Sequence, residues 1–493
     1  MESRLQIIKF GGTSVGSGER IRRVAHIIIH KVLDTAEDFP VVVVSAMAGV
    51  TDQLLRITKL ASLGAYDECE AEFNSLKQKH LEAAKHLSIK HEDRYNQLMH
   101  NLETAFSALQ QNIDELKVSV SQTLTHEIPL RTAAVAAWGE RLSVLLLAAA
   151  VCNSGVNAGP IQEEAIITEQ PLSEKHQTPG TVIGAEPLIH ETRVNVQKLA
   201  YPLIERQIVP IMPGFIGRTT TGLVTTLGRN GSDYSATVIG AALDCTEVSI
   251  YTDVDGVLSA DPRIVANARL LPRLSYAEAA RLSWFGAKVL HPRTLIPIAH
   301  LNIPVRVRNT FRPHSRGTLV GSERSQHTAA AAITIRHRLA LITVENTDMF
   351  GAPENAGQVF ALASRAGAAP VAICSSSGYH LSFMVEEQAA DSILELLQHD
   401  MGSWRVICKR GLAACACIGS GFSVDPMSSA RAITALARER IPVETQGASD
   451  SGIILIVEDQ DSERALRCLH RDLIAPVIPL VRHGTQEKRR EAR

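Results

Sequence analysis

The sequence predicts an α/β protein: a largely parallel central sheet between helices, followed by two ferredoxin-like βαββαβ units. Strand-like apolar runs alternate with helically spaced apolar residues up to about residue 325. The continuous β-branched run at 41–44 is typical of a strand buried on both faces of a parallel sheet. In the last third, the Pro-Val pair at 370–371 returns at 442–443, 72 residues later, which indicates an internal repeat.

Length and composition narrow the class of protein. The chain has 493 residues, more than one hydrophobic core of about 250–300 residues can organise. Its formal net charge of −2 argues against a nucleic-acid partner. The apolar run at 144–152 is far short of the roughly 20 residues that a membrane span needs, and the start of the chain leaves no room for a targeting peptide. Eight scattered cysteines without metal spacing predict a reducing, cytoplasmic location and no structural metal site.

The first loop follows the apolar run 5–8 and reads Lys9-Phe10-Gly11-Gly12-Thr13-Ser14-Val15, and helical spacing begins at Ile21. A lysine at a strand end, glycines that allow close backbone approach and a helix N-terminus together make an anion site. The loop matches neither a Walker loop nor a dinucleotide fingerprint. An ordinary strand-to-helix turn with a surface lysine remains the alternative.

The remaining elements follow in order. The strand 41–44 leads into the loop 45–51, and residues 66–125, polar and free of glycine and proline, predict a helical hairpin inserted into the sheet domain. Further strands are predicted at 208–212 and 247–252, and further helices at 234–243 and 276–285. We therefore expect four parts and a polar linker at 322–326: a catalytic domain at 1–325, repeats at 335–409 and 410–482, and a disordered tail at 483–493.

Three later loops carry residues suited to phosphate or carboxylate chemistry. The loop 227–236 combines Arg229, whose guanidinium can grip a carboxylate or phosphate, with Ser232 and Asp233 at a helix start, where either could simply cap the helix. The loop 251–263 carries carboxylates that suit nucleotide or magnesium contacts, or a plain Asp-Gly turn. The segment 285–292 places Lys288 after a helix, where it could equally be a surface lysine.

Together these segments resemble the motif set of aspartate kinases, members of the amino acid kinase superfamily. The segments 9–15, 45–51, 227–236, 251–263 and 285–292 occur in the family's order. The tandem repeat resembles the paired ACT regulatory domains of the same enzymes. The resemblance covers nearly the whole chain and is strongest to the kinase portion of bifunctional aspartokinase–homoserine dehydrogenases.

The resemblance implies roles for individual residues. Lys9 would bridge the transferring phosphoryl group, Asp233 would hold the cationic groups, and Lys288 would meet the phosphates. Arg229 would grip the α-carboxylate of aspartate and Glu140 its α-ammonium group. The other implied contacts are backbone N–H groups at Gly11 and Gly12, substrate contacts at Ser45, Thr51 and Ser232, and nucleotide contacts at Thr252, Asp253 and Asp261. Many relatives carry an aromatic residue where this chain has Leu258, which puts base stacking there in doubt.

The implied reaction transfers the γ-phosphoryl group of ATP, with Mg²⁺, to the β-carboxylate of L-aspartate, giving 4-phospho-L-aspartate at the start of lysine, threonine and methionine synthesis. A homodimer or larger assembly through the ACT domains is also implied. Two alternatives stay open: another amino acid kinase, and a non-catalytic amino-acid sensor. Glu140 and Arg229 together favour an α-amino acid substrate.

Feedback control is expected at two equivalent loops of the repeat. Threonine-sensitive relatives typically carry a glutamine in each loop. Here the second loop keeps Gln446, whereas the first carries Cys374, a poor hydrogen-bonding substitute for an amide. We therefore expect a single class of effector site centred on Gln446, with threonine the leading effector and lysine the next.

Overall fold

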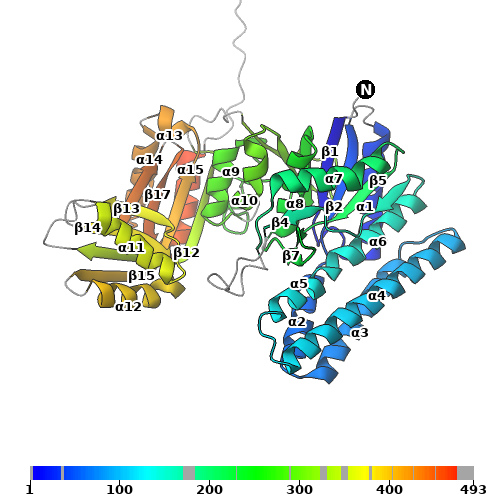
Figure 1. Cartoon of the computed structure of the whole chain (residues 1–493). Coiled ribbons are helices and arrows are strands. Elements are labelled where there is room, and N and C mark those ends of the chain that lie inside the picture. Colours follow the sequence, from blue (N-terminus) through cyan, green and yellow to red (C-terminus); the bar gives the residue numbers. More distant parts are fainter. Residues whose placement is uncertain are drawn as a thin grey trace, which may run out of the picture. The chain divides into compact units, whose positions relative to one another are not determined.

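The computed structural model describes residues 4–34, 38–169, 184–228, 230–287, 290–322, 330–345, 353–376, 380–401, 404–425, 427–449 and 451–474. The chain divides into two compact units, shown in Figure 1. The first contains Met1–Leu258 and Ala268–Ser325, and the second contains Ser259–Asn267 and Gln326–Arg493. The short segment Ser259–Asn267 therefore leaves the first unit and joins the second.

An eight-stranded sheet forms the centre of the first unit, in the order β3-β5-β2-β1-β8-β10-β11-β9. All neighbours are parallel except β10 and β11, so the predicted fold class is confirmed. The strands are β1 (Arg4–Phe10), β2 (Asp38–Val44), β3 (Ala158–Pro160), β5 (Val209–Pro213), β8 (Glu247–Thr252), β9 (Arg273–Ser275), β10 (Val305–Asn309) and β11 (Thr318–Gly321). A smaller sheet contains β4 (Ile166–Thr168), β6 (Ile216–Thr219) and β7 (Val224–Thr226).

Ten helices are described in the first unit. They are α1 (Gly18–Asp34), α2 (Val50–Ser62), α3 (Tyr66–Lys85), α4 (Glu92–Ser121), α5 (Ile128–Ala136), α6 (Trp138–Asn153), α7 (Ile189–Ile204), α8 (Gly231–Ala242), α9 (Tyr276–Trp284) and α10 (Pro292–Ala299). The apolar stripe that predicted α1 faces inward, with Ile21, Val24 and Ile28 fully buried. Helices α3 and α4 fill the region where a hairpin was predicted and run alongside each other (Figure 1). Their apolar residues share one hydrophobic core with β1, β2, α1 and α2.

Helices α5 and α6 form one strongly apolar stretch, Ile128–Asn153, which is long and apolar enough to cross a membrane by length and composition alone. Within its most apolar window, however, 78% of the residues are buried inside the protein. Leu142, Leu146 and Val151, for example, have no exposed surface. A helix that is apolar all round and covered by its own protein is a core helix, and we read α6 in this way.

The second unit is built on one antiparallel six-stranded sheet, in the order β13-β14-β12-β15-β17-β16. Its elements are β12 (Ala332–Glu345), α11 (Pro353–Arg365), β13 (Ala372–Ser376), β14 (His380–Glu386), η1 (Glu387–Ala389), α12 (Ala390–Asp400), β15 (Arg405–Ile418), α13 (Gly421–Val424), α14 (Met427–Arg438), β16 (Thr445–Ser449), β17 (Gly452–Glu458), η2 (Asp459–Asp461) and α15 (Ser462–Leu473). Both repeats therefore follow the predicted order of strand, helix, strand, strand, helix.

The two repeats share their long strands. The second half of β12 pairs with β14 and with the first half of β15, which completes a four-stranded first repeat. The first half of β12, from Ala332 to Arg336, pairs with the second half of β15 and fills the fourth-strand position of the second repeat. The predicted limits at 335 and 409–410 thus fall inside β12 and β15. The proposed division into 335–409 and 410–482 remains a prediction, and the tail at 483–493 lies outside the described residues.

Candidate active site

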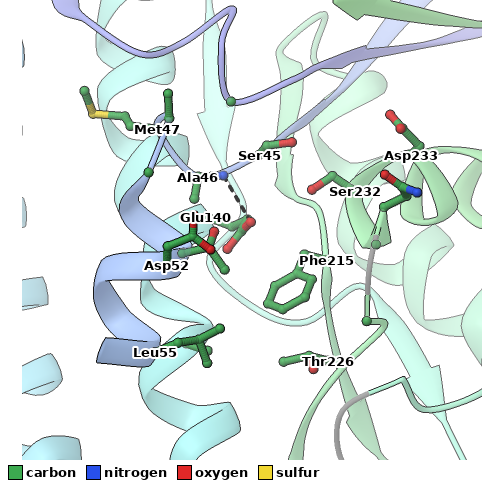
Figure 2. Close-up of a pocket in the computed structure, with 18 of the residues that line it drawn as sticks. Ser45, Ala46, Met47, Asp52, Leu55, Glu140, Phe215, Thr226, Ser232 and Asp233 are labelled. Carbon is green, nitrogen blue, oxygen red and sulfur yellow. Dashed lines mark hydrogen bonds between the residues drawn. The ribbon is translucent and has the colours of Figure 1, made fainter. Parts of the chain in front are cut away.

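A cavity of about 540 Å³ lies at the carboxyl ends of β1, β2 and β5, three neighbouring parallel strands. Ligands of open α/β sheets bind at this edge. Seven predicted site residues line the cavity: Lys9, Gly12, Ser45, Thr51, Glu140, Ser232 and Asp233. Figure 2 shows Ser232 and Asp233 on one side of it and Asp52 and Leu55 on the other. Segments more than 200 residues apart in the chain therefore meet in one place.

Lys9 and Asp233 form an ion pair within the cavity wall. The Lys9 ammonium lies 2.5 Å from a carboxylate oxygen of Asp233, and the two side chains are 8% and 16% exposed. Lys9 comes from the end of β1, and Asp233 comes from the first turn of α8. A pair so poorly solvated holds the lysine charge in one place. This arrangement matches the predicted role of Asp233 in holding a cationic group.

The first glycine-rich loop lies directly against the second loop. A Cβ atom on Gly12 would stand 2.8 Å from the carbonyl oxygen of Ala46, so only glycine allows this approach. Gly12 also accepts a hydrogen bond from the N–H group of Ala48 at 3.1 Å. The N–H group of Gly11 donates to the Tyr251 carbonyl at 3.1 Å and ties the end of β1 to β8. Its contact with the nucleotide remains a prediction.

Glu140 is the most deeply buried charged group of the cavity, with 2% of the residue exposed. One carboxylate oxygen, Oε1, accepts a hydrogen bond from the N–H group of Ala46 at 3.1 Å, drawn in Figure 2. The other, Oε2, is buried without a hydrogen-bond partner. Burial raises the pKa of Glu140 to about 8, although the bond from Ala46 and the charge of Lys9 oppose the rise. An unpaired buried carboxylate of this kind is suited to receive a cationic ligand group.

Two helix N-termini also face the cavity. Helix α2 begins after Gly49 and helix α8 begins after Asn230, and both preceding residues have left-handed backbone angles (φ 77° and 57°). Neither helix has a side-chain hydrogen bond at its N-cap. Uncapped N-termini carry partial positive charge and attract anions. Together with Lys9, the two N-termini supply positive potential around the cavity that also contains the carboxyl group of Glu140.

Several predicted residues lie elsewhere. Thr252 ends β8 and Asp253 follows it, and the Thr252 hydroxyl donates to the Asp253 carboxylate at 3.2 Å; neither residue lines the cavity. Asp261 belongs to the segment that joins the second unit, and pairs with Arg263 at 2.6 Å. Leu258 forms an isolated β-bridge with Leu270. The proposed nucleotide contacts of these residues remain predictions, and Arg229 and Lys288 lie outside the described residues.

The cavity also contains residues that the sequence analysis did not single out. Asp52 stands next to Thr51 in the first turn of α2, and Phe215 and Thr226 come from the β5–β6 loop and β7. Phe215 has a left-handed backbone angle (φ 65°) directly after β5. Its position could have been inferred, since β5 was predicted to be a buried strand and parallel strands place their carboxyl ends together.

Arg293, in the first turn of α10, holds the start of one predicted loop from outside the cavity. Its guanidinium donates to the carbonyl oxygens of Leu227, Gly184 and Ala185 at 3.1–3.3 Å and pairs with Glu186 at 2.8 Å. Leu227 stands two residues before Arg229, and Arg293 stands five residues after Lys288. The Arg293 side chain therefore fixes the backbone at the start of the 227–236 loop to the segment 184–186.

The predicted effector residues lie on the two edge strands of the second unit's sheet, Cys374 on β13 and Gln446 on β16. These edges come close together: a Cβ atom on Gly447 would lie 3.8 Å from the carbonyl oxygen of Ile373. Burial raises the pKa of Cys374 to about 11, although a hydrogen bond with the side chain of Thr445 opposes the rise. Gln446 is exposed. The structure thus brings the two predicted loops together within one unit.

Within the described ranges, no group of three or more His, Cys, Asp or Glu side chains is placed to hold a metal ion. Magnesium in kinases is usually held by one or two carboxylates together with the phosphates of the nucleotide. Asp52, Glu140 and Asp233 are the carboxylates among the described residues that line the cavity, and Asp233 pairs with Lys9.

Comparison with known proteins places the chain in a family. Residues 4–309 match the amino acid kinase family, and residues 416–473 match an ACT domain. The chain is 30% identical to chloroplastic aspartokinase 3 of Arabidopsis thaliana over 94% of this chain and 80% of that protein. It is 32% identical to an Arabidopsis bifunctional aspartokinase/homoserine dehydrogenase 2 over 94% of this chain and 50% of that protein. The chain thus spans about half the length of the bifunctional relatives it matches.

Solved structures give the same result. Escherichia coli aspartokinase III in complex with aspartate and ADP (R-state) superposes with a TM-score of 0.75 at 27% identity, covering 96% of this chain and all of that one. The same enzyme with lysine and aspartate (T-state) gives a TM-score of 0.73 at 26% identity, with the same coverage. The chain therefore belongs to the amino acid kinase family and, within it, to the aspartokinases.

Proposed function

We propose that this protein transfers the γ-phosphoryl group of ATP to the β-carboxylate of L-aspartate, giving 4-phospho-L-aspartate. The observation that carries the proposal is the cavity itself, which sets a buried carboxylate with one unpaired oxygen, Glu140, near a buried lysine, Lys9, and two uncapped helix N-termini. An α-amino dicarboxylic acid presents one ammonium and two carboxylates, and these charges complement the cavity. The E. coli relative has been solved with aspartate and ADP, which supports the same choice.

The chemistry explains why the cavity holds positive charge and no obvious general base. The β-carboxylate of aspartate has a pKa near ~4 and is already ionised at neutral pH. The obstacle is repulsion between this anion and the phosphates. Phosphoryl transfer therefore depends on positioning and on positive charge around the transferring group. Lys9 supplies that charge, and Asp233 keeps its ammonium in place.

Substrate binding divides between the two ends of the cavity. Glu140 receives the α-ammonium group of aspartate, while Ser45, Thr51 and Ser232 offer hydroxyl groups to its carboxylates. Arg229 grips the α-carboxylate. ATP enters as its magnesium complex, and Lys288, Gly12, Thr252, Asp253 and Asp261 are the residues that we assign to the nucleotide. These roles are carried over from the family motifs, and the cavity lining supports those of Ser45, Thr51, Glu140 and Ser232.

We further propose feedback inhibition by an amino acid that binds near Gln446, with threonine first and lysine second among the candidates. The closeness of Cys374, Thr445 and Gly447 at the meeting edges of the sheet supports a shared binding place. The lysine complex of the E. coli relative supports an amino-acid effector. Assembly into a homodimer or larger oligomer through the ACT repeats belongs to the same proposal, as does a cytoplasmic location, which the eight free cysteines support.

A coupled assay of ADP release tests the proposal. The purified chain is supplied with MgATP and with aspartate, with glutamate, or with no acceptor. Release that depends on aspartate supports an aspartate kinase, and release that depends on glutamate alone would make the chain a different amino acid kinase. Absence of release in all three arms, together with binding of an end-product amino acid, would instead support a sensor. Repeating the aspartate arm with threonine, lysine and methionine tests the feedback proposal.

A further inference from the structure

Lys79, on helix α3 of the inserted hairpin, makes a direct bond to the substrate loop. Its ammonium group donates to the carbonyl oxygen of Ala48 at 2.6 Å. Ala48 lies in the loop 45–51, which lines the active-site cavity. Lys79 itself does not line that cavity. It therefore acts on the loop from behind.

Hydrogen bonds hold the backbone of this loop at several points, and the first is the bond from the N–H group of Ser45 to the carbonyl of Phe10 at 3.1 Å. The N–H group of Ala46 donates to Glu140, and the N–H group of Ala48 donates to the carbonyl of Gly12, both at 3.1 Å. The bond from Lys79 joins the loop to helix α3, and it satisfies the carbonyl group of Ala48, whose N–H group is already bonded. Because Lys79 is half-buried, burial lowers its pKa. A charged donor in such a position makes a stronger hydrogen bond than a neutral one.

Cavities lie on both sides of the loop. A second cavity, of about 300 Å³, lies between the start of α1 and helix α3, with Lys79 and Met47 in its lining. Met47 also lines the active-site cavity. Met47 therefore lines both cavities, although its side chain is buried in the core, and the bond from Lys79 fixes the neighbouring carbonyl of Ala48 to helix α3.

Helix α3 is a firm support for the bond. A Cβ atom on Gly18 would lie 2.3 Å from the carbonyl oxygen of Ala83, so the backbones of α1 and α3 are in direct contact. Leu76, three residues before Lys79, is fully buried in the core that also contains Val50 and Leu54 of α2. The ammonium group thus projects from an element that is fixed relative to the loop.

We propose that Lys79 is a positioning residue for the amino-acid substrate: it holds the 45–51 loop in its binding conformation, and in this way the inserted hairpin contributes to the active site. The proposal rests on the proposed function, because Ser45 and Thr51, at the two ends of the loop, are assigned there to aspartate. It predicts an effect on aspartate that is much larger than the effect on ATP.

The test compares Lys79→Met with Lys85→Met, a matched change at an exposed lysine of the same helix. In Lys79→Met we expect the KM for aspartate to rise about tenfold, equivalent to about 1.4 kcal/mol. We expect kcat and the KM for ATP to change less than about twofold, and Lys79→Arg to restore part of the aspartate KM. Kinetics of Lys79→Met that match those of Lys85→Met, or equal increases in both KM values, would overturn the proposal.

Amide hydrogen exchange gives a readout that does not depend on catalysis. Exchange at Ala48 and in the first turn of α2 is expected to be faster in Lys79→Met than in the wild type, with little change in α4. Unchanged exchange would also overturn the proposal. A wild type that shows no aspartate-dependent ADP release would instead contradict the proposed function, and the exchange comparison would still decide whether Lys79 holds the loop.

Discussion

The active-site cavity and the meeting edges of the regulatory sheet both gather residues from distant segments, but they use different chemistry. The cavity holds charged groups out of water: Lys9 is 6% and Glu140 is 2% exposed. The regulatory edge offers the exposed amide of Gln446 and the neutral thiol of Cys374. Electrostatic interactions strengthen as water is removed. Substitutions in the cavity should therefore have large effects, and substitutions at the regulatory edge should have smaller, selective ones.

The largest effect is expected for Lys9→Ala, because Lys9 carries the buried positive charge beside the transferring group. We expect kcat to fall by about 10³-fold or more, together with a loss of stability, because the change leaves the poorly solvated carboxylate of Asp233 without its partner. The kcat is measured in steady-state assays at saturating aspartate and ATP. Lys59→Ala, on the exposed side of α2, is the control. Near-normal turnover in Lys9→Ala would remove the lysine from the mechanism. It would also contradict the expectation that substitutions in the cavity have larger effects than those at the regulatory edge.

Glu140→Gln should mainly weaken aspartate binding, since glutamine keeps the size of the side chain but loses its charge. We expect the KM for aspartate to rise about 100-fold, in line with the cost of removing one partner from a buried charge pair. The KM for ATP should stay nearly constant. Isothermal calorimetry with aspartate alone gives an independent measure, and unchanged aspartate affinity would contradict the assignment of Glu140 to the ammonium group.

The pH dependence of aspartate binding follows from the raised pKa of Glu140, about 8 in the free protein. Below that pH the carboxyl group is protonated and must lose its proton to pair with an ammonium group. The aspartate KM should therefore fall as pH rises toward about 8 and level off above it. Glu140→Gln should abolish this pH dependence. A wild-type KM for aspartate that stays constant between pH 6.5 and 8.5 would contradict the proposal that Glu140 must lose its proton to bind aspartate.

The raised pKa of Glu140 also makes the stability of the free protein depend on pH. Stability falls as pH rises, whereas aspartate binding improves. Between pH 4.5, the ordinary pKa of a glutamate, and about 8, the folded protein keeps a proton that the unfolded chain has lost. The contribution of Glu140 to the free energy of unfolding therefore falls as pH rises through this window. Urea titrations of the wild type and Glu140→Gln at pH 5 and 8 can detect this difference.

Arg229→Lys should have a smaller effect than the loss of Glu140, because the charge is kept and only the two-pronged hydrogen bonding is lost. We expect the KM for aspartate to rise about tenfold and the KM for ATP to rise less. The measurement is a pair of substrate titrations in the coupled assay. Equal weakening of both substrates would count against a specific role for Arg229 at the α-carboxylate.

Gln446→Ala should give the smallest change in catalysis. Its effect should be confined to the sensitivity of the enzyme to its amino-acid inhibitor. Loss of a neutral hydrogen bond costs about 1 kcal/mol, so the inhibitory concentration of the effector should rise about five- to tenfold. Uninhibited activity should match the wild type. Dose–response curves with threonine and lysine, with Cys374→Ala alongside, show whether one or both edge strands bind the effector. Full sensitivity in Gln446→Ala would reject the proposed effector site.

Local pattern was enough to predict most of the fold. The strands at 41–44 and 247–252 were found from their apolar runs, and helix α9 was found from its spacing. The glycine-rich loop after β1 was found because Gly-Gly after a strand permits close approach. These features depend on neighbours in the sequence. Family resemblance then supplied roles for Lys9, Glu140 and Asp233, which the structure places around one cavity.

The tertiary structure alone decided which groups meet and which are left unpaired. Two bonds join residues far apart in the chain: the bond from Lys79 to Ala48 and the bond from the N–H group of Gly11 to Tyr251. The packing around Glu140 likewise leaves one of its carboxylate oxygens without a partner. The use of Ala332–Arg336 to complete the second repeat likewise depends on which strand reaches the open sheet edge. Periodicity reports the face of a helix or strand that is buried, whereas the partner on that face is chosen by packing of the whole domain.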